Sequence, residues 1–180
     1  FCFGKNRKYC IEKLKELFKG AVIVIDEIKL DNIAVHSRII RDYIKNGDIK
    51  MANKLLGKKY KIYGQKIKGQ GLGAKSFVPT INLKVDEFLL PNEGVYITKT
   101  ILDEQEFNSI TFLGHRFTTD GSYAVETHIL DRDIEDKDYK IQIKFCDKIR
   151  DNKKFDSFEE LKNQILDDIK SAKNYFINIY

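Results

Sequence analysis

The sequence predicts an α+β protein in which a six-stranded antiparallel β-barrel with a C-terminal helix follows a short α/β segment. Three observations support this prediction. Residues 1–56 combine helical apolar spacing with one short apolar run, residues 57–145 change to alternating apolar and polar residues in six short segments, and an amphipathic stretch follows residue 156. Short strands separated by polar turns are typical of small barrels.

The first segment is expected to contain three helices and one strand. Apolar residues recur at helical spacing in the helices, Gly20 follows the first helix, and Asp48 precedes the last as a potential N-cap. A continuous β-branched run indicates a buried parallel strand. The expected elements are helices at 9–19, 36–47 and 48–56 and a strand at 21–26.

The second segment is expected to form the barrel and the covering helix. The predicted strands lie at 60–67, 80–85, 95–102, 107–113, 123–130 and 139–145. Ser157 and Glu160 have the spacing of a capping box, which marks the start of the last helix. Leu161, Ile165, Ile169 and Ala172 share one face of that helix, so we expect the face to cover the barrel.

Composition indicates a folded chain outside the membrane. The 180 residues are 42% apolar, with two prolines, and the net charge of +5 is small beside 32 basic and 27 acidic residues. No apolar run approaches the roughly 20 residues that span a bilayer, and the start does not resemble a signal peptide, so a soluble, cytoplasmic protein is expected. Three cysteines without metal-ligand spacing are expected to stay reduced.

A glycine-rich segment leads directly into two small oxygen-bearing side chains. Gly69, Gly71 and Gly73 allow backbone N–H groups to approach an anion closely, and Thr80 and Asn82 would share one face of a strand. The spacing differs from the Walker A loop and from the dinucleotide fingerprint. The pattern is suited to a metal-bound polyphosphate, although the spacing alone also fits a strand start whose side chains satisfy backbone groups.

This segment resembles the signature of riboflavin kinases, in which a glycine-rich loop precedes Pro-Thr-x-Asn. Two later matches, Gly94-Val95-Tyr96 and Glu126-Thr127-His128-Ile129, extend the resemblance over residues 57–180. The resemblance implies transfer of phosphate from ATP to riboflavin to give FMN, with Mg²⁺ held by Thr80 and Asn82. It also implies that Glu126 is the general base.

The same resemblance implies the remaining site residues. The polyphosphate would be bound by Gly69, Gly71, Gly73, Lys75 and Thr80, and the flavin by Arg150 and Phe155, whose segment resembles the family's flavin-site motif. Tyr123 is a candidate aromatic wall for the flavin, and Arg116 is a candidate contact to flavin or phosphate. His128, two residues after Glu126, could orient that carboxylate, although a lone histidine is more often structural. The chain departs from the family pattern at Ser76-Phe77-Val78, where a glycine is replaced, and at His115.

Residues 1–56 resemble the end of the FMN adenylyltransferase domain that precedes the kinase in bacterial bifunctional flavin enzymes. That domain's His-x-Gly-His motif is not in the sequence. We therefore expect a truncated domain at 1–56 and a kinase domain at 57–180, with adenylyl transfer only in a complete parent chain. The oligomeric state stays open.

Two other functions fit parts of the sequence. A basic β-barrel could bind single-stranded nucleic acid through lysines and exposed aromatic rings. A flavin-binding module without turnover would also retain the apolar walls that a flavin needs. Neither explains Pro79-Thr80-Ile81-Asn82 together with Glu126, so riboflavin and ATP are the expected partners, without nucleic acid or membrane.

Overall fold

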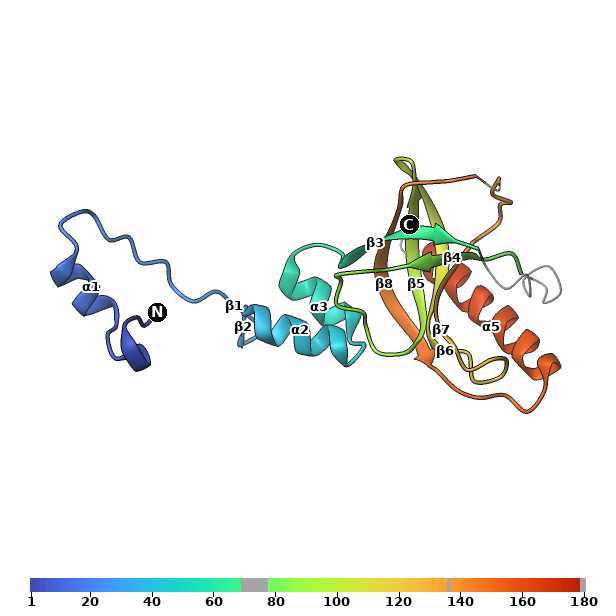
Figure 1. Ribbon diagram of the computed structural model, residues 1–180, viewed down its shortest axis with the longest axis horizontal. Helices are drawn as coiled ribbons and strands as arrows, with labels where there is room; N and C mark the ends of the chain where they lie inside the picture. Colours follow the sequence, from blue (N-terminus) through green and yellow to red (C-terminus); the bar gives the residue numbers. More distant parts are fainter. Residues whose placement is uncertain (69–77, 136, 179–180) are drawn as a thin grey trace. The chain divides into compact units, whose positions relative to one another are not determined.

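A computed structural model describes residues 1–68, 78–135 and 137–178 (Figure 1). The chain forms two compact units, Phe1–Val35 and His36–Tyr180. The boundary between these units lies upstream of residue 57, where the sequence predicts that the kinase domain begins, and that division stays a prediction. All candidate site residues that the structure describes belong to the second unit.

The first unit contains the predicted helix but not the predicted strand. Its elements are η1 (Lys5–Arg7), α1 (Ile11–Leu17), β1 (Lys29–Leu30) and β2 (Ile33–Ala34). The prediction of a buried strand at 21–26 is wrong, because these residues form no strand and Ile23 and Ile25 are 87% and 85% exposed. A strand needs a neighbour for its backbone hydrogen bonds, and within residues 1–35 none pairs with this run.

The second unit opens with the two predicted helices, α2 (Ser37–Lys45) and α3 (Ile49–Leu56). The Asp48 carboxylate caps α3 by accepting a hydrogen bond of 3.0 Å from the backbone N–H three residues later. The amide of Asn53 donates to the carbonyl of Phe145 at 2.9 Å. This hydrogen bond fixes α3 to the wall of the barrel.

Six antiparallel strands close into the predicted barrel in the order β3-β4-β7-β6-β5-β8. Figure 1 shows these strands wrapping around one interior. Their bounds are β3 Lys61–Ile67, β4 Ile81–Lys84, β5 Gly94–Leu102, β6 Gln105–His115, β7 Tyr123–Ile129 and β8 Ile141–Asp151. Alternation along each strand decides which side chains face the interior.

The barrel interior combines an apolar cluster with a set of hydroxyl groups. Large apolar side chains, including Tyr96, Leu113 and Phe145, are fully buried there. Beside them lies the hydroxyl network, whose members are linked by hydrogen bonds of 2.8–3.1 Å. Its members are Thr98, Thr100, Ser109, Thr111 and Thr127. Hydrogen bonding removes most of the cost of burying these polar groups.

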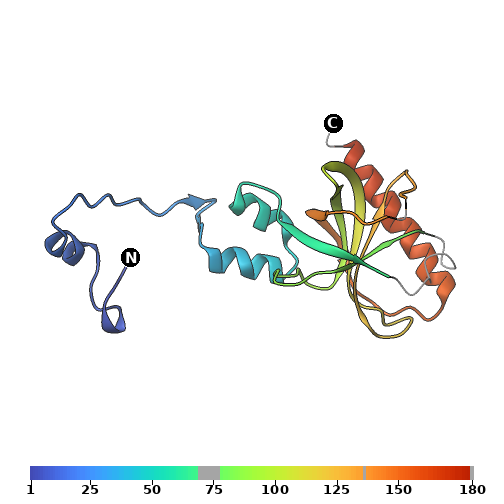
Figure 2. The ribbon, with the colours of Figure 1, turned by 45° about the horizontal axis from the view of Figure 1, so that its top comes forward.

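The last helix, α5 (Phe158–Ile177), lies against the outside of the barrel, as Figures 1 and 2 show. The Ser157 hydroxyl accepts a hydrogen bond of 3.1 Å from the N–H of Glu160, which confirms the predicted start. Ala172 and Phe176 of the helix pack on Ile97 and Ile110 of the barrel wall. Among the described helices, none is long and apolar enough to cross a bilayer.

Candidate active site

Two of the predicted site residues lie opposite each other on neighbouring strands. Asn82 of β4 is the register partner of Glu126 of β7. Leu83 and Val125, which follow and precede them along the chain, belong to the interior apolar cluster. Because successive side chains of a strand point to opposite faces, Asn82 and Glu126 both lie on the outer face of the barrel.

Arg116 joins these two side chains. Its Nη2 donates to Oδ1 of Asn82 at 2.7 Å and to Oε1 of Glu126 at 2.5 Å, and its Nε donates to the same Glu126 oxygen at 2.9 Å. Arg116 and Glu126 are only 17% and 23% exposed, which makes this ion pair stronger than an ordinary surface pair. The result is a compact cluster of amide, guanidinium and carboxylate.

The loop between β6 and β7 holds Arg116 in place. The backbone N–H of Arg116 donates to the carbonyl of Ser122 at 2.9 Å, and its Nη1 donates to the Ser122 hydroxyl at 2.8 Å. That hydroxyl in turn donates to Asp120 at 2.9 Å. Gly121, with φ at 72°, supplies the left-handed residue that lets the chain turn so tightly.

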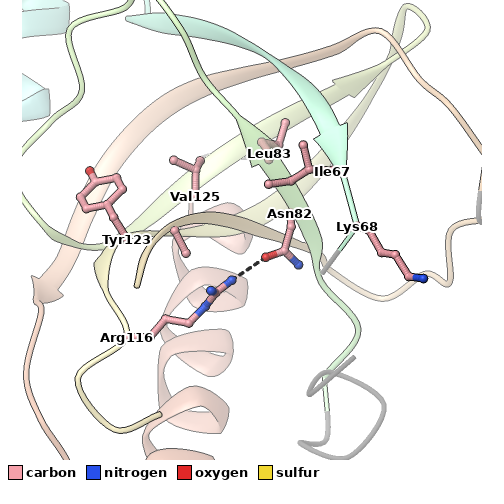
Figure 3. A pocket seen from close by; sticks show the side chains of 8 residues that line it. Ile67, Lys68, Asn82, Leu83, Arg116, Tyr123 and Val125 are labelled. Carbon is pink, nitrogen blue, oxygen red and sulfur yellow. Dashed lines mark hydrogen bonds between the residues drawn. The ribbon is translucent and has the colours of Figure 1, made fainter. Parts of the chain in front are cut away.

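A pocket of about 210 Å³ opens beside the cluster. Figure 3 shows Arg116 reaching toward Asn82, with Tyr123 on one side and Lys68 on the other. Burial and the nearby charge of Glu93 raise the pKa of Tyr123, which keeps its phenol neutral at neutral pH. One end of the pocket is therefore aromatic and the other is cationic.

Thr80 is exposed and lies immediately before β4. The preceding peptide is held from β7, because Nδ1 of His128 lies 2.8 Å from the carbonyl oxygen of Pro79. Burial lowers the pKa of His128, and the hydrogen bond to Pro79 only partly opposes this shift. The imidazole is therefore neutral at neutral pH, with its proton on Nδ1 because a carbonyl oxygen can only accept.

The side chains at this point suit a hard divalent cation bound together with phosphate. Thr80 and Asn82 offer a hydroxyl and an amide oxygen, which are ligand types that Mg²⁺ accepts when phosphates and water complete its shell. The position already accommodates positive charge, since the guanidinium of Arg116 contacts both Asn82 and Glu126. Among the described residues, no group of three or more His, Cys, Asp or Glu forms a metal cluster.

Two predicted flavin residues lie in a different cluster. Both Arg150 nitrogens that face α5 bind the carboxylate of Asp168, with Nε 3.0 Å from each oxygen and Nη2 2.9 Å from Oδ2. The ring of Phe155 packs against the Arg150 guanidinium at 5.5 Å. The Phe155 N–H donates to the hydroxyl of Thr118, at 3.1 Å, which connects this cluster to the loop that carries Arg116.

The structure thus brings Asn82, Arg116, Tyr123 and Glu126 together, whereas Arg150 contacts Asp168 and Phe155 and neither Arg150 nor Phe155 lines the pocket. Gly69, Gly71, Gly73, Lys75 and the departure at Ser76-Phe77-Val78 lie outside the described residues. The functional assignment of every one of these residues stays a prediction.

Sequence reasoning missed three features of the cluster. It did not anticipate that Arg116 binds Glu126, that Ser122 supports Arg116, or that His128 holds Pro79. Each contact joins different strands or the two ends of a loop, so no local spacing reveals it. The one available signal was the shared face of Glu126 and His128 on a strand.

These features define a class: a closed antiparallel β-barrel whose outer face carries a cluster of amide, guanidinium and carboxylate groups beside a pocket. The sequence model of the riboflavin kinase family (Flavokinase) matches residues 56–176. The chain therefore belongs to the riboflavin kinase family.

The relatives are longer proteins. The chain is 34% identical to a bifunctional riboflavin kinase/FMN adenylyltransferase from Haemophilus influenzae, over 98% of the chain and 59% of the relative. A protein of the same description from Bacillus subtilis is 27% identical over 99% of the chain and 59% of its own length. A crystal structure described as a macrolide-efflux protein from Streptococcus pneumoniae matches with a TM-score of 0.85 at 30% identity, covering 97% of this chain and 58% of that one.

Proposed function

We propose that this chain transfers the γ-phosphoryl group of ATP to the 5′-hydroxyl of riboflavin, giving FMN and ADP. The observation that supports this proposal most directly is the register of β4 and β7, which places Asn82 opposite Glu126 within the segment that matches the riboflavin kinase family. The cytoplasmic location expected from the sequence is part of the same proposal.

Each need of phosphoryl transfer has a candidate residue. Thr80 and Asn82 would hold Mg²⁺, which would neutralise phosphate charge when it is bound. Glu126 would accept the proton of the 5′-hydroxyl while the new P–O bond forms and the bond between the γ-phosphorus and the β,γ-bridging oxygen breaks. In the described residues, only one oxygen of the Glu126 carboxylate, Oε1, accepts a hydrogen bond, which leaves Oε2 for the substrate.

The two ends of the pocket suggest how the substrates lie. Lys68, at the cationic end, would attract phosphate, whereas the ring of Tyr123 offers an apolar surface to the flavin. The chain spans 59% of the length of the Haemophilus influenzae relative. The second activity in that relative's name, FMN adenylyl transfer, is proposed only for a complete chain of comparable length.

Chromatographic detection of FMN after incubation with riboflavin, ATP and Mg²⁺ tests the proposal. The parent chain is expected to form FMN, and a Thr80→Ala, Asn82→Ala double variant is expected to form almost none, because both proposed metal ligands are removed. Riboflavin binding, followed by flavin fluorescence, should persist in the double variant. A folded parent that binds riboflavin without forming FMN would be a flavin-binding module, and one that binds oligonucleotides but no flavin would support the nucleic-acid alternative.

Arg116 has a further consequence for nucleotide binding. Its guanidinium donates to Oδ1 of Asn82, so a metal bound to the same oxygen would lie close to the charge of Arg116. The variant Arg116→Gln is expected to bind magnesium–ADP at least about fivefold more tightly than the parent, because even in water two like charges about 4 Å apart repel by about 1 kcal/mol. Calorimetric titration measures this directly.

Arg132→Gln is the matched control for Arg116→Gln, because Arg132 is an exposed cation that packs on the ring of Phe107 and is absent from the pocket lining. It should leave magnesium–ADP affinity unchanged. Weaker binding by Arg116→Gln would instead make Arg116 a phosphate contact. Loss of riboflavin affinity alone would support the flavin-binding role expected from the sequence.

A further inference from the structure

The strand that leads into the proposed metal ligands is paired over a very short length. β4 and β7 are joined at only two register positions, Ile81 with Thr127 and Asn82 with Glu126. Thr80, the next residue toward the N-terminus, lies outside this ladder. The backbone of Thr80 therefore lacks the pairing with β7 that fixes Asn82.

A side chain continues the attachment where the ladder ends. His128, which follows the last paired residue of β7, contacts the carbonyl oxygen of Pro79 through Nδ1 at 2.8 Å. Proline has no backbone N–H, so this carbonyl is the only hydrogen-bonding group that Pro79 can offer. The imidazole thus takes the place of a backbone donor from β7.

This one hydrogen bond restricts several torsion angles. The peptide group between Pro79 and Thr80 is planar, so holding its oxygen also holds the nitrogen of Thr80. The proline ring already fixes φ of Pro79 near −65°, and the ladder fixes the chain from Ile81 onward. Thr80 is therefore anchored on both sides, and its side chain keeps a defined position relative to Asn82.

We propose that His128 is a positioning residue that holds Thr80 in the geometry required to bind the metal of the metal–nucleotide substrate. The inference rests on the proposed kinase function and adds a role for a residue that the sequence suggested was structural. His128 touches neither substrate nor metal in this role. It acts through the Pro79–Thr80 peptide alone.

Two substitutions separate this role from simple packing. His128→Phe keeps a planar ring but removes the donor. His128→Asn removes the ring but places the amide Nδ2 the same number of bonds from Cα as Nδ1 of histidine, so the donor is retained. If the hydrogen bond positions Thr80, the asparagine variant should behave like the parent and the phenylalanine variant should not.

Magnesium–ADP binding, measured by calorimetry without riboflavin, is the primary readout. His128→Phe is expected to weaken this binding about three- to tenfold, the range for loss of one hydrogen bond. The magnesium–ADP affinity of His128→Asn should remain within about twofold of that of the parent. Riboflavin affinity should stay close to that of the parent for both variants, which excludes general misfolding as the cause.

A double-mutant cycle with Thr80 tests the route of the effect. In a Thr80→Ala background, His128→Phe should no longer change magnesium–ADP affinity, because the ligand that His128 positions is gone. Parent-like binding by His128→Phe, failure of folded His128→Asn to retain affinity, or an unchanged effect in the Thr80→Ala background would each overturn the proposal. A parent chain that binds no magnesium–ADP at all would instead overturn the proposed kinase function.

Discussion

Replacing Glu126 by Gln is expected to lower the turnover of riboflavin to FMN by about 10²- to 10⁴-fold, the usual contribution of a general base. Gln has nearly the same shape, and its amide oxygen can still accept the hydrogen bonds that Arg116 donates to Glu126. It cannot accept the proton of the 5′-hydroxyl. Both substrates should therefore bind within a few-fold of their parent affinities, as measured by calorimetry, while kcat falls.

Glu106→Gln is the matched control. Glu106 lies on β6 and also accepts hydrogen bonds from cations, those of Lys99 and Lys144, each at 2.8 Å, but it does not line the pocket. Its substitution should leave kcat unchanged. Turnover by Glu126→Gln close to that of the parent would remove Glu126 from the role of base, and a loss of riboflavin binding would assign it to substrate binding.

Replacing Asp168 by Ala is expected to lower the free energy of unfolding by about 3–5 kcal/mol, which is typical when one partner of a buried ion pair is removed. Asp168 is 2% exposed and binds Arg150 through both carboxylate oxygens. Its loss leaves a largely buried guanidinium without its counter-ion between β8 and α5. Urea denaturation followed by far-ultraviolet circular dichroism measures the change, which is large beside the usual 5–15 kcal/mol of a domain.

Two further variants test whether the unpaired charge of Arg150 causes this loss of stability. Asp167→Ala alters the exposed neighbouring residue of the same helix and should change stability by less than about 0.5 kcal/mol. Replacing Arg150 by Met together with Asp168 by Leu should cost less than Asp168→Ala alone, since no unpaired charge remains. A loss below about 1 kcal/mol for Asp168→Ala would show that Arg150 finds water or another partner, as expected of an exposed ion pair.

The barrel could be predicted because the signals for its strands and helix starts lie within short stretches of sequence. Alternating apolar residues define each strand, and capping residues such as Asp48 and Ser157 mark helix starts that the structure confirms. The strand bounds shift because pairing, rather than hydrophobicity, decides where a ladder stops. β8, for example, runs on to Asp151, six residues past its predicted end, because β5 continues to pair with it.

The features that escaped prediction depend on partners remote in the sequence. The run at 21–26 has strand composition, but within the described residues 1–35 no neighbour pairs with it. The contacts of Arg116 with Asn82 and Glu126 link three separate elements. The ion pair of Arg150 with Asp168, 18 residues further along the chain, likewise has no local sequence signal.

The hydroxyl network has a consequence for how the barrel finds its alignment while it folds. A slip of one residue between β6 and β7 would turn the inward-facing side chains of the slipped strand outward, so the burial pattern rejects it. A slip of two residues keeps the same side chains facing inward, so the burial pattern would not reject it. In the native alignment Thr111 lies opposite Thr127, whereas a two-residue slip in either direction would set it against Val125 or Ile129.

Such a mispairing would break the hydrogen bond between Thr111 and Thr127, and the net contribution of one hydrogen bond is about 0.5–1.5 kcal/mol. The hydroxyls thereby distinguish alignments that the apolar pattern treats as equal. Thr127 stands between Glu126 and His128 on β7, so the placement of β7 in the barrel also determines where the proposed base and the imidazole lie, opposite Asn82 and beside Pro79. The packing of the buried interior therefore helps to align the proposed site residues on the outer surface.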